Sequence, residues 1–272
     1  MARKRISGRQ WIYILLTWVV VIGLWWVERH LDSDPYKSTN GSAEITEFPK
    51  AYLPAYRGGE FVSHDHYLLS YIEKYEQAAW VAYALDKTHL TGQDRKRPYY
   101  IQDPDVRTGS ADWRNYKGSG YDRGHLCPAG DRKFSETAYN QTFYTSNISP
   151  QDSEFNAGIW NELEQQVRRW ARRYDRVYVI TGGVLHKDLQ TIGTEGVAVP
   201  DAFYKVVIRR SGEDIRALGF LIPNSPTDQP VGKFILSLDE LEALSGLDFF
   251  ADLSEPQQES LEKDIDTRPW GF

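Results

Sequence analysis

The chain is nearly devoid of cysteine: its 272 residues include only Cys127, so no internal disulfide can form. Cys127 is then either a small buried apolar residue or a free thiol. His125 lies two residues away and could act as its base, but residues at that spacing on an extended segment need not touch. We therefore expect Cys127 to be buried and disfavour a cysteine nucleophile.

An excess of positive charge is also missing. The 32 Lys and Arg residues stand against 38 Asp and Glu, and four of the basic residues precede residue 11, where no acidic residue lies. The rest of the chain therefore carries 28 basic and 38 acidic side chains, a formal net charge of −10. Nucleic-acid binding usually rests on a broad basic face, so this composition argues against a protein that grips nucleic acid over its whole surface.

Two short basic stretches could still form a local patch. Arg95, Lys96 and Arg97 are consecutive. The second set belongs to one predicted helix and the residues after it: Arg168, Arg169, Arg172, Arg173 and Arg176. A solvated helix face explains this second set equally well.

One uncharged run stands out, and we expect it to be a transmembrane signal anchor. Residues 11–27 contain no charged side chain and are at the short end of what spans a bilayer as a helix. Aromatic residues near both ends suit the two membrane interfaces. The basic segment 1–10 and Glu28 after the run predict a cytoplasmic N-terminus, with residues 28–272 outside the cytoplasm, in a periplasm or an organellar intermembrane space.

The alternative is a cleaved signal peptide, which would carry a shorter apolar region and a small-residue cleavage site. The run ends instead in Trp25-Trp26-Val27, which favours the anchor. Residues 28–60 are rich in Ser, Thr, Asn, Pro and Gly and predict a flexible tether. Residues 61–272 show no internal repeat and no second linker, and they suffice for one domain with a full core.

The pattern of this domain predicts an α+β fold with a mostly antiparallel sheet. Apolar and aromatic runs bounded by turn residues predict strands at 79–85, 143–148, 176–181, 202–209, 216–222 and 234–236, and a short extended segment at 121–126. Helices are expected within 129–139, over 153–174, and from Ser237 to a stop at Gly246.

The helix expected at 153–174 places an amide and a carboxylate on one side. Asn156 and Glu164 are eight residues apart, a little over two turns. A carboxamide oxygen suits Mg²⁺, which keeps several of its waters, and Glu164 could hold one of them. Taken alone, the pair is better explained by a capping or surface Asn156 and by an ion pair of Glu164 with Arg168 at i+4.

His125 shifts that balance towards chemistry. Hydrolysis of a phosphodiester needs a base of near-neutral pKa on one side of the phosphorus and a cation on the other. Imidazole supplies the base without adding negative charge beside the phosphate. Next to it, Asp122 could orient the loop, Arg123 could pair with a phosphate, and Gly124 allows a close approach of the backbone.

The segment Asp122-Arg123-Gly124-His125 resembles the signature of the DNA/RNA non-specific endonuclease family, the ββα-metal nucleases of the Serratia nuclease and endonuclease G type. The stretches 80–83, 145–151, 246–250 and Asn156…Trp160…Leu163-Glu164 are also similar to the family. The resemblance covers about residues 61–255. It implies the ββα-metal fold, a central antiparallel sheet flanked by helices.

The resemblance also implies a role for each matching residue. His125 would activate the attacking water, Asn156 would be the direct protein ligand of Mg²⁺, for which Mn²⁺ can substitute, and Glu164 would bind metal waters. The metal would stabilise the leaving 3′ oxygen and give 5′-phosphate ends. Asn147 matches a supporting asparagine near the site.

An upstream arginine of the family binds phosphate, and Arg97 is our assignment, with Arg95 as the alternative. With Lys96 and Arg123 these residues form the expected nucleic-acid contact. DNA and RNA are the substrates that the resemblance implies. Neither a preference between them nor dimerisation, which is possible, follows from the sequence.

Two other motifs carry less. His64-Asp65-His66 could share a metal on a strand, but no third ligand follows at a useful spacing. Thr181-Gly182-Gly183-Val184 lacks the Lys-Ser/Thr ending of a phosphate loop and predicts a strand end.

Besides a membrane-anchored nuclease, two alternatives remain open: a membrane-tethered module of the same fold that binds nucleic acid without cutting it, and a phosphodiesterase for small substrates. The intact set of His125, Asn156 and Glu164 favours the nuclease, since a module without catalysis has no need of all three.

Overall fold

The computed structural model describes residues 11, 15–23, 48–55, 58–263 and 265–272. It divides into two units, residues 1–39 and residues 40–272, which are described separately. In the first unit, residues 15–23 are helical with exposed side chains. Within the described ranges, no helix is long and apolar enough to cross a membrane. Residues 1–10, 12–14, 24–47 and 56–57 lie outside the described residues, and they include both ends of the expected anchor region and most of the expected tether.

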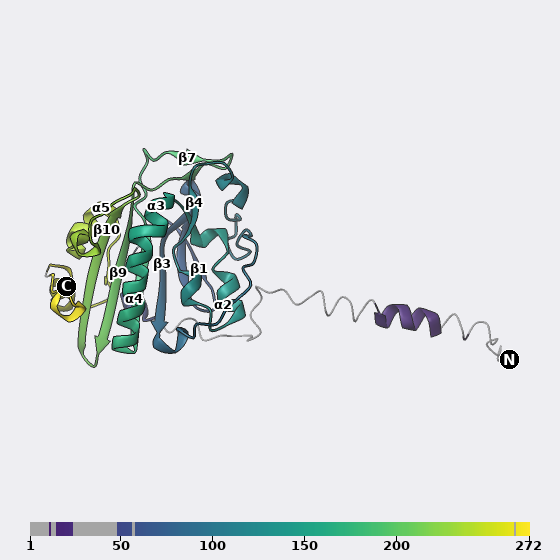
Figure 1. The fold of residues 1–272 in the computed structure, drawn as a ribbon, viewed down its shortest axis with the longest axis horizontal. Helices are drawn as coiled ribbons and strands as arrows, with labels where there is room; N and C mark the ends of the chain where they lie inside the picture. The colour runs from purple at the N-terminus through teal and green to yellow at the C-terminus, as the bar shows by residue number, and fades with distance from the viewer. Residues whose placement is uncertain (1–10, 12–14, 24–47, 56–57, 264) are drawn as a thin grey trace. The chain divides into compact units, whose positions relative to one another are not determined.

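A seven-stranded, fully antiparallel sheet forms the centre of the second unit (Figure 1). In spatial order its strands are β1 (Glu60–Ser63), β2 (Leu68–Ile72), β3 (Gln77–Asp86), β6 (Arg176–Gly183), β9 (Ala202–Ser211), β10 (Asp214–Pro223) and β11 (Ile235–Leu236). Two small sheets pair β4 (Asp122–His125) with β5 (Ile148–Gln151) and β7 (Thr191–Ile192) with β8 (Val197–Ala198). The predicted α+β fold with an antiparallel central sheet is confirmed.

The helices are α2 (Glu136–Gln141), α3 (Ser153–Phe155), the π-helical turn η7 (Asn156–Trp160), α4 (Asn161–Tyr174), α5 (Leu238–Ser245) and α6 (Glu255–Glu262). Short 3₁₀ turns are η1 (Lys50–Tyr52), η2 (Glu73–Tyr75), η3 (Lys87–His89), η4 (Trp113–Tyr116), η5 (Ala129–Asp131), η6 (Thr145–Asn147), η8 (Val231–Phe234) and η9 (Arg268–Trp270). As predicted, α5 begins after Ser237, whose hydroxyl accepts from Glu240 N–H, and ends at Gly246 with φ 71°.

Both faces of the sheet are covered, because side chains alternate between two cores along each strand. On one face Val179 and Val207 pack with Leu163, Val167 and Trp170 of α4, which crosses in front of the sheet in Figure 1. On the other face the neighbouring strand residues pack against α5, α6 and the Leu247–Phe250 segment. Full burial of one such apolar side chain stabilises the fold by about 1.5–3 kcal/mol. This packing fixes α4, and with it Glu164, against the central sheet.

The folded unit begins earlier than the predicted boundary at residue 61. Phe48 and Tyr52 are buried on the second face of the sheet, where the centre of each ring lies 5.6 Å from the centre of the Tyr178 ring. Ala55 also bridges to Asp248. The predicted tether is thus wrong from residue 48 onward. This segment has the composition of a linker, and its two buried aromatic residues show no periodicity that would predict packing against the sheet.

The helix expected over 153–174 is interrupted. Asp152 caps α3 by accepting from the N–H groups of Glu154 and Phe155, and the chain then widens into the π-helical turn. Helical geometry is lost at Gly158, with φ −94° and ψ −110°. The wider turn inserts a residue into the helical repeat, a feature that often marks functional sites.

The strand expected at 143–148 is also wrong. Residues 145–147 form the turn η6, and β5 starts only at Ile148 and includes Pro150. Pro150 is tolerated because β5 pairs with β4 on one side alone, so no ladder hydrogen bond is lost. The apolar residues before the turn are buried for packing and not for pairing.

Candidate active site

Two strands and the interrupted helix form one continuous ββα unit. His125 ends β4 opposite Ile148, and Gly124 lies opposite Ser149 in β5. A Cβ at Gly124 would collide with the side chain of Gln151, so only glycine fits this closely packed hairpin. The hairpin thereby fixes His125 against the helix that follows it.

A cavity of about 250 Å³ opens between the end of β4 and the helix. It is lined by His125, Pro128, Ala129, Gly130, Asn156, Ala157, Asn161 and Glu164. The structure thus brings together the three residues on which the sequence prediction rests. Asn161 was not predicted; it joins the set because the π-helical turn changes which residues share a face.

Asp122 holds the side chain of Asn156. Asn156 Nδ2 donates to Asp122 Oδ2 at 3.0 Å, and Ser153 Oγ donates to Asp122 Oδ1 at 3.0 Å. Since the amide hydrogens face Asp122, the carboxamide oxygen is left to act as an acceptor or ligand. Asp122 therefore positions Asn156, a more specific task than orienting the loop.

His125 is held as a neutral base. Burial, and secondarily the charge of Arg97, lowers the pKa of His125 to about 3. Nε2 of the ring is buried without a hydrogen-bond partner. Phe143 packs edge-on against the ring with 4.9 Å between centroids. A neutral imidazole with a free nitrogen can accept a proton, and a phosphate charge placed beside it would raise its pKa.

Glu164 sits in a buried network of charges at the floor of the cavity. Its Oε2 accepts from Arg168 at 3.2 Å, and Arg168 Nε in turn donates to Asp131 Oδ1 at 2.5 Å. Burial raises the pKa of Glu164 to about 7, against the opposing charges of Arg168 and Lys205. The simple ion pair at i+4 is therefore present, and it coexists with a place on the cavity wall.

Lys205 is a buried cation that the sequence gave no reason to single out. Burial lowers its pKa to about 8, its Nζ donates to Thr181 Oγ1 at 3.2 Å, and it lies 4.4 Å from the centre of the Trp160 ring. It stands among the buried, mostly apolar residues of β9, so only the sheet register brings it near Glu164. Alternation along the strand places it on the α4 side.

Asn147 is a positioning residue. Its Nδ2 donates to the carbonyls of Cys127 (3.0 Å) and Thr142 (2.9 Å), and its Oδ1 accepts from Cys127 N–H at 2.8 Å. The side chain is fully buried and satisfied by backbone alone. It holds the chain after His125 in place and does not line the cavity. Cys127 is buried as predicted, and burial raises the pKa of its thiol to about 12.

Of the two candidate phosphate ligands, Arg97 lies at the site and Arg95 does not. Arg97 donates to Tyr100 Oη at 2.6 Å and its charge reaches His125. The guanidinium group of Arg95 instead binds the backbone, where it donates to the carbonyls of Lys133 and Phe134 at 2.9 and 3.3 Å. Lys96 is exposed between them.

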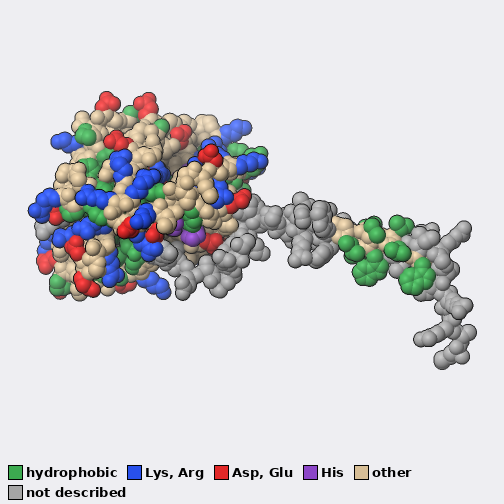
Figure 2. Space-filling view, turned by 60° about the horizontal axis from the view of Figure 1, so that its bottom comes forward, with side chains coloured by type: hydrophobic (Ala, Val, Ile, Leu, Met, Phe, Trp, Pro, Cys, Tyr) green, Lys and Arg blue, Asp and Glu red, His purple; other side chains and the backbone are tan. Residues whose placement is uncertain are grey.

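The rest of the basic surface is dispersed. On the face drawn in Figure 2, Lys and Arg side chains are interspersed with Asp and Glu. Arg169, Arg172 and Arg173 are exposed on α4, a solvated helix face, while Arg176 pairs with Asp86 at 2.8 Å. The face drawn in Figure 2 is therefore not broadly basic, and the basic residue that lies near His125 is Arg97.

The donor set of the cavity fits a hard divalent cation. Asn156 offers a neutral oxygen whose orientation is fixed, and Glu164 offers a carboxylate across the cavity. These are the oxygen ligands that Mg²⁺ uses while it keeps several waters. The other histidine motif is different: His64 Nε2 lies 2.8 Å from Asp103 Oδ2 and Nδ1 lies 3.5 Å from Asp105, so it ties two loops together, and His66 packs against Phe134.

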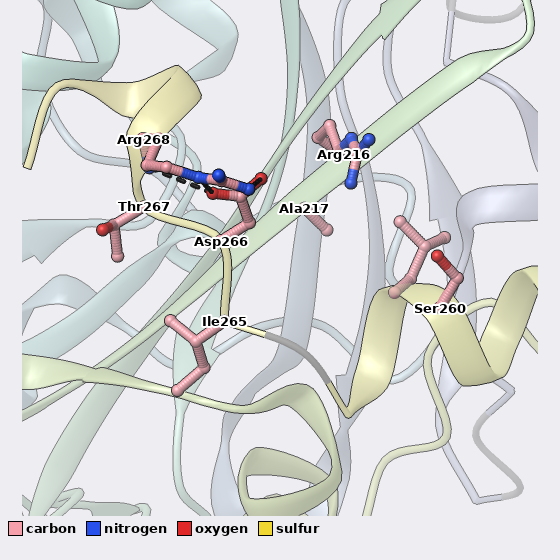
Figure 3. Close-up of a pocket in the computed structure, with 8 residues that line it drawn as sticks. Arg216, Ala217, Ser260, Ile265, Asp266, Thr267 and Arg268 are labelled. Atoms are coloured by element: carbon pink, nitrogen blue, oxygen red, sulfur yellow. Dashed lines mark hydrogen bonds and ion pairs between the residues drawn. The ribbon is translucent and has the colours of Figure 1, made fainter.

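A second cavity, of about 500 Å³, lies at the C-terminal end of the chain (Figure 3). Its two cations are neutralised, because Arg216 pairs with Asp214 at 2.9 Å and Arg268 with Asp266 at 2.8 Å. None of the residues that line this cavity is a histidine. The smaller cavity at His125 is therefore the candidate active site.

Residues 46–255 match the family model described as DNA/RNA non-specific endonuclease. Human mitochondrial nuclease EXOG is 37% identical over 235 residues, which cover 80% of this chain and 64% of that protein. Human mitochondrial endonuclease G is 35% identical over 221 residues, which cover 75% of this chain and 73% of that protein. The crystal structure of the EndoG/EndoGI complex contains a chain similar to this one, with a TM-score of 0.71, 30% identity and coverage of 81% of this chain and 96% of that chain. The chain spans a little under two thirds of the human, Xenopus laevis and Danio rerio EXOG proteins.

Proposed function

We propose, given that the chain belongs to the DNA/RNA non-specific endonuclease family, that it is a magnesium-dependent endonuclease hydrolysing the phosphodiester bonds of DNA and RNA without sequence specificity. One observation carries the proposal: His125, Asn156 and Glu164 line a single cavity, with Asp122 turning the Asn156 oxygen free. A base and a cation ligand on one site are what hydrolysis of a phosphodiester requires.

His125 performs the proton transfer in this proposal. Its neutral imidazole accepts a proton from water as the water oxygen attacks the phosphorus in line, and the bond from phosphorus to the 3′ oxygen breaks on the opposite side. The 3′ oxygen leaves with the bonding electron pair and takes a proton from water, while His125 returns its proton to solvent, so the products are a 5′-phosphate and a 3′-hydroxyl. A magnesium ion held by Asn156, with Glu164 binding its waters, would supply positive charge to the phosphate and to the leaving oxygen.

Arg97 and Arg123 orient the substrate. Both guanidinium groups lie over the Tyr100 ring, at 5.3 and 4.9 Å from its centre, and that ring centre is 5.9 Å from the centre of the His125 ring. Guanidinium groups match phosphate oxygens in bidentate pairs. Contacts to phosphate carry no information about the bases, so binding through these two guanidinium groups would support cleavage without sequence preference.

The direct test uses the full chain with supercoiled plasmid and with single-stranded RNA. We expect nicked and then degraded plasmid, and cleaved RNA, in the presence of magnesium, and no cleavage with EDTA. Intact plasmid and RNA at high enzyme concentration with magnesium or manganese would overturn the enzyme and leave the binding module. Equal rates on dinucleotides and long chains would instead favour the phosphodiesterase for small substrates.

We also propose that residues 11–27 anchor the enzyme in a membrane with the nuclease unit outside the cytoplasm. The uncharged run and the basic segment 1–10 support this, and confinement would keep a non-specific nuclease from the genome of its own cell. Membrane fractionation tests it: the full chain should stay in the pellet after alkaline extraction and residues 48–272 should be released. Full release of the intact chain would exclude the anchor.

A further inference from the structure

A row of alternating guanidinium groups and aromatic rings leads away from His125. Next to the histidine ring is Phe143, and the guanidinium carbon of Arg97 lies 5.7 Å from the Phe143 centre and 5.3 Å from the Tyr100 centre. The row continues with Arg123, which also lies over the Tyr100 ring. Its members are Phe143, Arg97, Tyr100, Arg123 and Trp113, which we call the arginine–aromatic row.

Arg123 joins the two halves of the row. Its guanidinium carbon lies 4.9 Å from the centre of Tyr100 and 5.8 Å from the centre of Trp113. Arg123 comes from β4, whereas Trp113 is the first residue of η4. Arg123 thus links groups from two separate segments of the chain, and the row lies beside His125, whose ring centre is 4.9 Å from that of Phe143 and 5.9 Å from that of Tyr100.

The rings in the row have different exposures. Phe143 and Tyr100 are buried, so they hold the two guanidinium groups in fixed orientations and are not available to a base. Trp113 is only partly buried at the outer end of the row. It alone among these three rings is partly accessible to a ligand.

The outer end of the row is electrically neutral. Arg114 lies 5.4 Å from the Trp113 ring, but its Nη1 is paired with Asp112 at 2.6 Å, and Asp112 also caps η4. A phosphate would gain little charge there, because the carboxylate offsets the cation. A flat, apolar nucleobase suits this end better than a phosphate does.

We propose that the arginine–aromatic row is a track for one unpaired strand, with successive phosphates on Arg97 and Arg123 and a base stacked on Trp113. Stacking of bases on aromatic side chains beside a cationic groove is how single strands are held without sequence preference. The proposal rests on the proposed function, because the track starts at the catalytic site. It deepens that function by naming the favoured substrate: a single-stranded or locally unpaired chain that extends several nucleotides to one side of the cleaved bond.

The test compares kcat/KM for a 12-nucleotide single-stranded DNA with kcat/KM for a dinucleotide, which is too short to reach Trp113. In the wild type the longer substrate should be strongly preferred. Trp113→Leu keeps an apolar side chain but removes the aromatic face, so the ratio of the two values should fall about tenfold, the loss expected for one stacked base. Trp113→Phe should keep most of the ratio.

Arg173→Ala is the matched control. Arg173 also lies over an aromatic ring, 5.2 Å from the centre of Tyr174, but on an exposed part of α4 and outside the row. Its removal should leave the ratio unchanged. A salt titration adds a second readout: Arg123→Ala should lower the slope of log Kd for the oligonucleotide against log salt by about one, whereas Trp113→Leu should weaken binding without changing the slope.

The outcomes separate the track from the enzyme. Failure of the wild type to cleave either substrate with magnesium would overturn the proposed function itself. If the wild type cleaves both but Trp113→Leu lowers both rates in proportion, the tryptophan acts through folding and the track is wrong. A changed salt slope in Trp113→Leu would likewise refute stacking, because the tryptophan would then act by placing Arg123.

Discussion

Asn156 donates its Nδ2 hydrogen to Asp122 Oδ2 at 3.0 Å, and this bond decides which end of the carboxamide faces the cavity. The acceptor belongs to the strand that also carries His125. The proposed metal ligand and the proposed base, which come from different elements, are therefore held relative to one another through this one side chain. Such supporting contacts commonly change metal affinity 10- to 100-fold when they are removed.

Asp122→Ala should consequently weaken magnesium binding more than it weakens folding. Without the carboxylate the Asn156 amide can rotate and present hydrogens to the cation. We expect the magnesium concentration for half-maximal cleavage to rise about tenfold. Ser153→Ala, which removes only the neighbour's bond to the other Asp122 oxygen, is the control and should have a smaller effect. An unchanged magnesium dependence in Asp122→Ala would contradict the positioning role.

Glu164 should make the metal-free protein sensitive to pH. Burial raises the pKa of its carboxyl from 4.5 to about 7, so its contribution to stability is present below about pH 4.5 and is lost as the pH rises through 7. In EDTA, Glu164→Gln should therefore be more stable than the wild type at pH 8, by about 1–3 kcal/mol at about 1.4 kcal/mol per unit, and equally stable at pH 4.

Denaturant unfolding at the two pH values measures this difference, with the exposed Glu162→Gln as the control on the same helix. Magnesium should reverse the order, because it binds the folded wild type and stabilises it. A wild type that is more stable than Glu164→Gln in EDTA at pH 8 would show that Arg168 and Lys205 outweigh the burial of the carboxylate.

Asn147→Ala should cost stability first and activity second. The substitution leaves the buried Cys127 N–H and two carbonyls without partners, at about 1–3 kcal/mol for each unsatisfied group. We expect the free energy of unfolding, measured with urea, to fall by several kcal/mol, while kcat of the remaining folded protein falls modestly. Full stability with abolished kcat would instead give Asn147 a place in the chemistry.

Arg97→Ala and Arg95→Ala form a matched pair that tests which arginine serves the substrate. Arg97→Ala should raise KM for plasmid and lower the salt slope of binding by about one, because it removes one phosphate contact. Arg95→Ala should leave both nearly unchanged and only loosen the loop at Lys133 and Phe134. The reverse pattern would exchange the assignments.

How far the sequence predicted the site depends on how local each signal is. Asp122 to His125 lie on one short strand, so a contiguous motif defines them, and the α4 apolar face follows from spacing alone. Helical spacing also predicted that Asn156 and Glu164 meet, but on the assumption of an unbroken helix. The π-helical turn interrupts that helix at Gly158, and Phe155 and Trp160 on either side of it pack against Phe203, a contact that spacing does not reveal.

Other features were unpredictable because they arise from contacts across the sheet. Lys205 lies among the buried, mostly apolar residues of β9 and gains its place near Glu164 only through register with Thr181. Phe48 and Tyr52 read as part of a linker until their pocket beside Tyr178 is known. Trp113 enters the arginine–aromatic row through Arg123, which lies ten residues later in the chain and belongs to another element.

The central claim is that His125 is the base of a magnesium-dependent hydrolysis, and nicking of supercoiled plasmid by the wild type and by His125→Ala tests it most directly. We predict cleavage by the wild type with magnesium and a loss of at least about 10²-fold in the variant, at unchanged unfolding midpoint. Wild-type rates in a folded His125→Ala protein would contradict the account.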